Sequence, residues 1–150
     1  MVERPTHPEW RDYSGIQGIR EVITAEIRRR GWALIATDGG SKGKTFEERK
    51  ASYGIAAGQR TWEGRVGGLD QTSYKSELWA LYKLLKSIAG VRGRIIVIID
   101  NQAVAREAAL RKVGQGTKGI NCGGLWERIQ GELTTCPGIA FEWVPSHGKK

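Results

Sequence analysis

Short apolar stretches alternate with polar segments along the chain, and their lengths and spacing separate the expected strands from the expected helices. Nearly continuous apolar runs predict buried strands at 32–37, 94–100 and 139–144. The run at 94–100 is rich in β-branched residues, which are typical of strands in parallel sheets. Two further strands, at 52–58 and 61–69, are expected on either side of a short turn.

Four other segments have apolar residues at intervals of three or four, which is the spacing of a helix. The predicted helices cover residues 16–30, 73–90, 102–112 and 125–135. After the first helix, the chain is expected to run through three strands, a helix, a strand, two helices and a last strand. This order indicates an α/β fold with a five-stranded mixed sheet and helices on both of its faces.

The helix expected at 73–90 carries a carboxylate on its apolar face. Leu81, Leu84 and Ile88 form an apolar stripe, and Glu77 lies four residues before Leu81 on that stripe. A carboxylate that faces the core is unfavourable unless a cation meets it. Glu77 is therefore a candidate for binding a positively charged group.

Length and charge limit the function classes. The chain has 150 residues, which favours one domain, and 24 Lys and Arg against 16 Asp and Glu give a net charge of +8. Such a balance is common in proteins that bind polyanions, but solubility alone also explains it. No apolar run approaches the roughly 18 residues of a membrane-spanning helix, and the N-terminus has no signal-peptide pattern. We therefore expect an intracellular protein without a membrane partner.

Cysteine and histidine are too few for a structural zinc site. Cys122 and Cys136 are the only cysteines, neither belongs to a C-x-x-C pair, and there are two histidines. A single disulfide and two reduced thiols both stay open, and reduced thiols are expected in an intracellular protein.

The segment TDGGSKGKT at 37–45 allows two interpretations. Gly43, Lys44 and Thr45 supply the second half of a nucleotide-binding P-loop, but Asp38 stands where its first glycine should be. A P-loop also opens directly into a helix, whereas turn and strand are expected here. We therefore disfavour a P-loop NTPase and interpret the segment as a strand that ends in a carboxylate and runs into a solvent-exposed turn.

Three carboxylates are candidates for one shared site. Asp38 and Asp100 each end an apolar strand, and Glu77 lies on an apolar helix face. Ligands gather at the carboxyl ends of parallel strands, so the three side chains are expected to converge if those strands are neighbours. Three close carboxylates cannot all stay ionised without a cation, and Mg²⁺ or Mn²⁺ suits oxygen ligands. Such clusters support two-metal phosphoryl chemistry.

Four blocks of sequence resemble the type 1 ribonuclease H family. They are TDGGSKG before a pair of strands, QTSYKSELWAL, IIDNQAV, and LWERI followed by FEWVPSHG, in this order within residues 32–150. The ending WVPSHG is similar to ribonuclease H domains attached to retroelement reverse transcriptases. The resemblance implies a ribonuclease H-like domain at 32–150 and a reverse transcriptase domain as a partner within a longer polyprotein.

The family's reaction is cleavage of the RNA strand of an RNA/DNA hybrid, which leaves a 5′-phosphate and a 3′-hydroxyl. The resemblance implies two Mg²⁺ ions, which Mn²⁺ can replace, and metal-binding carboxylates at Asp38, Glu77 and Asp100. It also implies that His147 assists proton transfer or product release. Considered alone, His147 is as readily an ordinary exposed loop residue.

Residues that contact the hybrid are implied in two of the blocks. Short polar side chains can recognise the 2′-hydroxyls in the wide minor groove of A-form-like hybrids without reading sequence. Helix capping is the competing role for Thr72 and Ser73, and both roles are compatible. The implied hybrid contacts are Thr72, Ser73, Tyr74 and Gln102.

The chain departs from the family pattern in three places. The family's fourth acidic residue and closing helix have no counterpart, so we expect a C-terminally truncated domain, and a weak or inactive nucleic-acid-binding module or retroelement fragment is the alternative function. Residues 113–124 lack most of the basic handle of bacterial members. Residues 1–31 are expected to be an extension or linker with a short basic helix. Without that basic handle, hybrid affinity would depend on another domain or on Arg28 to Arg30. These three arginines are equally well explained by the preference of a helix C-terminus for cations.

Overall fold

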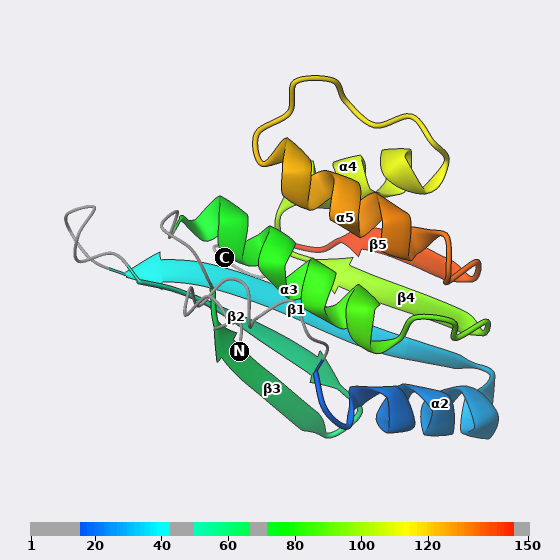
Figure 1. Ribbon diagram of the computed structural model, residues 1–150. Coiled ribbons are helices and arrows are strands. Elements are labelled where there is room, and N and C mark those ends of the chain that lie inside the picture. The colour runs from blue at the N-terminus through cyan, green and yellow to red at the C-terminus, as the bar shows by residue number, and fades with distance from the viewer. Residues whose placement is uncertain (1–15, 43–49, 67–71, 146–150) are drawn as a thin grey trace, which may run out of the picture.

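The centre of the molecule is a five-stranded mixed sheet. The computed structural model describes residues 16–42, 50–66 and 72–145. The strand order is β3-β2-β1-β4-β5, in which β1 pairs antiparallel with β2 and parallel with β4, and β5 is parallel to β4 (Figure 1). The strands are β1 (Trp32–Lys42), β2 (Lys50–Ala57), β3 (Arg60–Arg65), β4 (Arg94–Ile99) and β5 (Ile139–Trp143).

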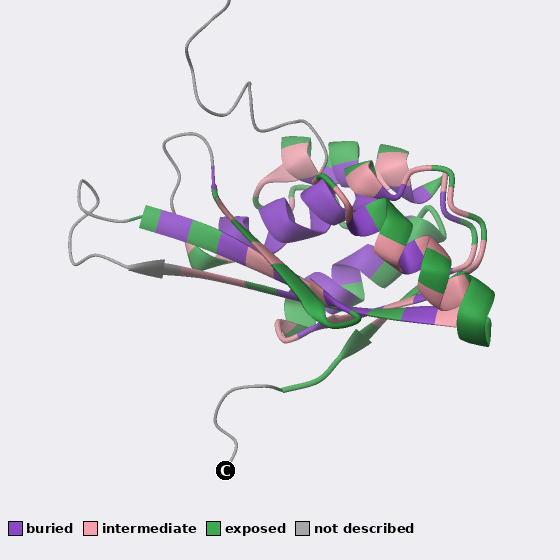
Figure 2. Ribbon diagram, turned by 90° about the horizontal axis from the view of Figure 1, so that it is seen from below, coloured by how far each residue is buried: buried purple, intermediate pink, exposed green. Residues whose placement is uncertain are grey.

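Four helices pack on one face of this sheet in the described part of the chain (Figure 2). They are α2 (Ile19–Arg30), α3 (Ser73–Ser87), α4 (Gln102–Lys112) and α5 (Gly123–Leu133). The central helix α3 contacts β1, β2 and α5, while α4 covers β5 and the neighbouring part of β4. None of these helices is long and apolar enough to cross a membrane.

The predicted α/β fold with a five-stranded mixed sheet is confirmed, as is the order of strands and helices. The expected placement of helices on both faces of the sheet differs from the structure, in which the described helices cover one face. The prediction differs most at β1, which was expected to end at residue 37 but continues to Lys42. Backbone pairing with β2 carries it on, through Gly39↔Tyr53 to Lys42↔Lys50. Residues 39–42, which would form the start of a P-loop turn, thus belong to a strand, while Gly43, Lys44 and Thr45 lie outside the described residues.

Alternation along β1 separates a covered face from an open face. Ala33, Ile35 and Thr37 point to the helices and are buried, whereas Leu34 and the next even-numbered residues lie on the other face. The same period of two runs through β2 and β4. The main core therefore lies between the sheet and the helices, and the open face carries no helix among the described residues.

Helix α3 is buried more completely than its pattern predicts. The stripe of Leu81, Leu84 and Ile88 is fully buried, as expected, but Lys75 and Lys83 are also less than a tenth exposed. The sheet and the helices α2 and α5 surround α3 on several sides, so even its polar positions are covered. Thr72, rather than Ser73, caps this helix by accepting a hydrogen bond from the Lys75 amide at 3.1 Å.

Helix α2 lies in the segment where a short basic helix was expected, and it packs into the core. Its Ile19 and Ile23 side chains are fully buried. Hydrogen bonds anchor its start at two places, where the Ile16 amide donates to Ser87 Oγ and Trp62 Nε1 donates to the Gln17 carbonyl at 3.1 Å. The part of the predicted extension that lies before residue 16 is outside the described residues.

Candidate metal centre

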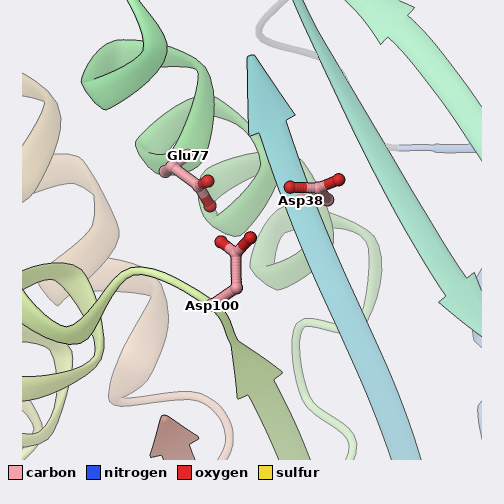
Figure 3. A group of neighbouring side chains, drawn as sticks. All are labelled: Asp38, Glu77 and Asp100. Carbon is pink, nitrogen blue, oxygen red and sulfur yellow. The ribbon is translucent and has the colours of Figure 1, made fainter. Parts of the chain in front are cut away.

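Asp38, Glu77 and Asp100 lie together at one edge of the sheet. One carboxylate oxygen from each is within 4.8 Å of the other two. Figure 3 shows Glu77 reaching from α3 toward Asp100 at the end of β4, with Asp38 projecting from β1 beside them. The expectation that these three side chains converge is thus met by the geometry.

The parallel pairing of β1 and β4 brings the two aspartates side by side. Their register runs from Trp32↔Arg94 to Thr37↔Ile99, so Asp38 and Asp100 each follow directly after the last of these pairs. Carboxyl ends of neighbouring parallel strands form the usual ligand-binding edge of an open α/β sheet. The sequence position of each aspartate at a strand end therefore fixes its place in the site.

Gly39 allows α3 to bring Glu77 to the same point. A Cβ atom at Gly39 would lie 2.4 Å from Ser76 Oγ and 2.8 Å from the backbone nitrogen of Glu77. Any side chain at this position would push the first turn of α3 away from β1. The Gly39 amide also donates a hydrogen bond to Asp38 Oδ1 at 2.9 Å, which orients that carboxylate.

Glu77 is the most buried acid of the three. It is 6% exposed, and its Oε1 atom has no hydrogen-bond partner among the described residues. Burial first, and then the adjacent carboxyl groups of Asp100 and Asp38, raise the pKa of Glu77 to about 9. At neutral pH, without a cation, the Glu77 carboxyl therefore holds a proton.

These observations fit a divalent cation. Three oxygen donors converge, one of them is buried with an unpartnered oxygen, and a bound cation would favour the ionised form of Glu77. The donors are all carboxylates, which suits the hard ions Mg²⁺ and Mn²⁺ rather than a metal that needs thiolate or imidazole ligands. Cys122 and Cys136 do not belong to this cluster and are not joined by a disulfide.

The site opens onto the uncovered face of the sheet. A hollow of about 340 Å³ is lined there by Asp38 and Asp100 together with apolar residues that include Ala36, Ile98 and Val144. Next to Val144, Trp143 at the end of β5 is 43% exposed and donates a hydrogen bond from Nε1 to the Asp100 carbonyl at 3.1 Å. This bond ties the end of β5 to the strand end that carries Asp100.

The expected hybrid contacts lie around the start of α3 and α4. Ser73 is exposed at the first position of α3, and Gln102 is exposed at the first position of α4. Thr72 acts as the cap of α3, the competing role that the sequence left open. His147 lies outside the described residues.

Tyr74 uses its hydroxyl inside the protein. It accepts a hydrogen bond from Trp126 Nε1 at 2.9 Å and donates one to the Asn121 carbonyl at 3.1 Å. Burial raises the pKa of Tyr74, and the hydrogen bond from Trp126 opposes that rise. The hydroxyl thus links the start of α3 to the segment between α4 and α5.

A buried ion pair fixes the same segment from the other side. Arg111 donates to Glu107 at 2.8 Å, and Thr117 donates to Glu107 through both its amide, at 2.7 Å, and its hydroxyl, at 2.6 Å. Burial alone would raise the pKa of Glu107, but the hydrogen bonds from Thr117 and Arg111 outweigh it and hold that pKa below its usual range. The chain between α4 and α5 is therefore tied down by polar contacts at both ends.

Sequence reasoning missed two residues that support the site. Gly39 was assigned to a turn, although a glycine directly after a strand-ending carboxylate is a signal for close backbone approach. Trp143 was assigned to a strand as an apolar residue, and nothing in the sequence indicates that its ring nitrogen reaches the Asp100 carbonyl.

Comparisons with known proteins agree with this architecture. No family model and no curated sequence matches the chain. Among solved structures, a foamy viral protease-reverse transcriptase in complex with dsDNA matches with a TM-score of 0.62 and 20% identity, over 76% of this chain and 81% of that one. The solution structure of the PFV RNase H domain matches with a TM-score of 0.58 and 20% identity, over 77% of this chain and 79% of that one.

A third solved structure gives a similar match. LC11-RNase H1, in a structure with an RNA/DNA hybrid, has a TM-score of 0.60 and 17% identity, over 76% of this chain and 86% of that one. The likeness to these solved structures adds to the evidence from the strand order, the single covered face and the carboxylates at neighbouring strand ends. The chain has the fold of type 1 ribonuclease H.

Proposed function

We propose that this protein hydrolyses the RNA strand of RNA/DNA hybrids endonucleolytically, with two divalent metal ions, and leaves 5′-phosphate and 3′-hydroxyl ends. The single observation that carries this proposal is the cluster of Asp38, Glu77 and Asp100, whose carboxylate oxygens lie within 4.8 Å of one another at a strand edge. The fold shared with ribonucleases H, one of them solved with an RNA/DNA hybrid, supports the choice of substrate.

Each carboxylate has a distinct part in holding the ions. Asp38 is exposed and can present an oxygen to the open side of the site, while Glu77 is buried and reaches it from α3. Asp100 lies between these extremes and is held through its backbone by Trp143. Divalent ions bound in such a site lower the pKa of a coordinated water and stabilise the leaving oxygen.

The protein contributes substrate position as well as ligands. Ser73 and Gln102 are exposed near the site, where polar groups can contact the hybrid's backbone and 2′-hydroxyls. We propose the same contacts for Thr72, whose hydroxyl also caps α3, whereas Tyr74 acts through Trp126 and Asn121. We also keep His147 as a proposed aid to proton transfer or product release, and a retroelement reverse transcriptase as the proposed neighbouring domain.

The test is cleavage of an end-labelled hybrid in Mg²⁺, in Mn²⁺ and in EDTA. The wild type is expected to cut the RNA strand with either ion and not in EDTA. Asp38→Asn is expected to lose more than about 100-fold in rate, because even the partners of metal ligands cost 10–100-fold when removed. Glu127→Gln, which changes an exposed acid on α5, serves as the matched control and should cut like the wild type.

Two outcomes would contradict the proposal. Full cleavage by Asp38→Asn would remove the carboxylate cluster from the reaction. Salt-dependent binding of the hybrid without cleavage in either ion would instead assign the chain to the alternative, a weak or inactive module with the same fold.

A further inference from the structure

The end of the sheet opposite the carboxylates carries a cluster of arginines. The last turn of α2 contains Arg28, Arg29 and Arg30, and β1 begins two residues later. Trp32 at the start of β1 is paired in register with Arg94 at the start of β4. Figure 1 shows the end of α2 and the starts of β1 and β4 together on the right of the molecule. The basic edge is defined here as Arg28, Arg29, Arg30, Arg92 and Arg94.

Most of the charge on the basic edge is not neutralised by acids in the part of the chain that the structure describes. Arg28, Arg92 and Arg94 are exposed and form no ion pair with any residue in the described ranges. Arg29 and Arg30 share the single carboxylate of Glu26, at 2.9 and 3.0 Å. These five arginines and Glu26 together carry a net charge of +4, which is half of the chain's net +8.

A structural role accounts for only part of this cluster. Cations in the last turn of a helix are favourable, which explains Arg28, Arg29 and Arg30 on α2. It does not explain Arg92 and Arg94, which precede and begin a strand. Like charges that gather without carboxylates repel one another, so the arrangement costs stability unless an anion is bound.

One side chain of the edge is already held in place. The Arg30 guanidinium lies 3.9 Å from the centre of the Trp32 ring and donates to the Trp32 carbonyl at 3.2 Å. A guanidinium that stacks on an aromatic ring keeps its remaining donors in one plane, which suits a phosphate oxygen. The edge therefore offers fixed as well as adaptable donors to an anion.

We propose that the basic edge binds the phosphate backbone of nucleic acid, as a second contact separate from the carboxylate cluster. The choice of nucleic acid rests on the proposed function. The six steps along β1 from Trp32 to Asp38 correspond to about 20 Å at roughly 3.3 Å per residue. Contact with both regions therefore requires either a hybrid that extends some 20 Å beyond the scissile bond or a separate strand.

The test measures hybrid affinity by fluorescence anisotropy in EDTA, where cleavage does not interfere. The Arg28→Ala, Arg92→Ala, Arg94→Ala triple variant removes three cations that form no ion pair with another described residue. We expect it to bind a long hybrid on the order of tenfold more weakly, with the salt dependence of log K reduced by roughly 2–3. The matched control replaces the same three residues by lysine, which keeps the charge and should keep most of the salt dependence.

Hybrid length distinguishes the two sources of phosphate. If the edge binds the flank of a hybrid held at the carboxylates, the loss will appear with a long hybrid and not with one of about six base pairs, since 20 Å is about six steps of 3.4 Å. If the edge binds a separate strand, short and long hybrids will lose affinity alike. Either pattern supports the proposal.

Unchanged affinity and salt dependence in the alanine triple, with wild-type thermal unfolding, would overturn the inference. Its failure and that of the proposed function are separable, because Asp38→Asn tests cleavage alone. Cleavage that survives in Asp38→Asn would refute the metal centre. A normal salt dependence in the triple would refute the basic edge and leave the metal centre intact.

Discussion

The two ends of the paired strands β1 and β4 carry opposite charges and differ in how far their charged side chains are exposed. At the carboxyl ends, Asp38, Glu77 and Asp100 crowd within 4.8 Å, and Glu77 is 6% exposed. At the other ends, the arginines of the basic edge are exposed and spread over a helix terminus and two strand starts. The acids are held together by the fold although they repel one another, whereas the arginines stay accessible.

This difference separates the ligands that each end can bind. Crowded, partly buried carboxylates need a small multivalent cation that several oxygens can share. Exposed arginines remain ionised at all relevant pH values and suit an extended polyanion. One pair of strands thus separates a site for cations from a surface for phosphates by about 20 Å, at roughly 3.3 Å per residue.

The largest expected effect is a loss of stability when the packing of α2, which carries part of the basic edge, is weakened. Ile23 on α2 is fully buried against the sheet, so Ile23→Ala should lower the free energy of unfolding by about 2–5 kcal/mol. We propose on this packing that α2 belongs to the folding unit. Urea denaturation measures the loss, and Glu21→Ala on the exposed side of α2 should change stability by less than about 0.5 kcal/mol. Equal stability of Ile23→Ala and the wild type would show that α2 is an appendage.

The next effect is at the carboxylate end. Gly39→Ala forces a Cβ against Ser76 and the backbone of Glu77, so α3 must shift, at a cost of about 1–3 kcal/mol. Cleavage should fall with stability, because Glu77 moves with α3. Gly40→Ala is the matched control, since a Cβ there meets nothing within 4 Å. Similar cleavage rates for the two alanine variants would contradict the role assigned to Gly39.

The pKa of Glu77 predicts how stability varies with pH. The folded-state pKa is raised from 4.5 to about 9, so the folded protein binds a proton more tightly than the unfolded chain. The stability that this proton provides is fully present below pH 4.5 and is lost as the pH rises through about 9. Glu77 therefore makes the metal-free protein less stable with rising pH within this window.

Denaturation curves in EDTA across this pH range measure the effect. Glu77→Gln, which cannot ionise, should flatten the decline, and saturating Mg²⁺ should flatten it in the wild type by favouring the ionised carboxylate. An unchanged pH profile in Glu77→Gln would show that the Glu77 carboxyl is not the group that titrates.

The smallest expected effect concerns Trp143. Trp143→Phe removes the donor to the Asp100 carbonyl and should cost about 1 kcal/mol of stability, together with a modest loss of Mg²⁺ affinity. Trp62→Phe is the matched control. Trp62 lies on another strand, β3, and its ring nitrogen donates a hydrogen bond of the same length to the Gln17 carbonyl. This variant should lose similar stability with no change in Mg²⁺ affinity. Equal Mg²⁺ affinities in the two variants would remove Trp143 from the metal centre.

The sequence predicts those features that depend on period and order. Apolar runs predicted the strands. The positions of Asp38 and Asp100 directly after such runs predicted that their side chains converge. Glu77 could be placed because a carboxylate on an apolar stripe requires a partner. These inferences succeed because strand ends and helix faces are set by local pattern.

Features that depend on contacts between distant segments could not be predicted. The burial of Lys75 and Lys83 follows from the helices around α3, which no local pattern shows. The extension of β1 to Lys42 depends on pairing with β2, which overrides the turn preference of its glycines. Likewise, Arg94 lies at the same end of the sheet as the end of α2 only because β1 and β4 pair in parallel.

Diffraction from crystals grown with Mn²⁺ tests the shared cation site most directly, because Mn²⁺ gives anomalous density at its own position. We predict anomalous density enclosed by the carboxylates of Asp38, Glu77 and Asp100. We also predict that this density is lost from crystals of Asp38→Asn. Density at another place, or carboxylates that turn away from one another with Mn²⁺ present, would contradict the account.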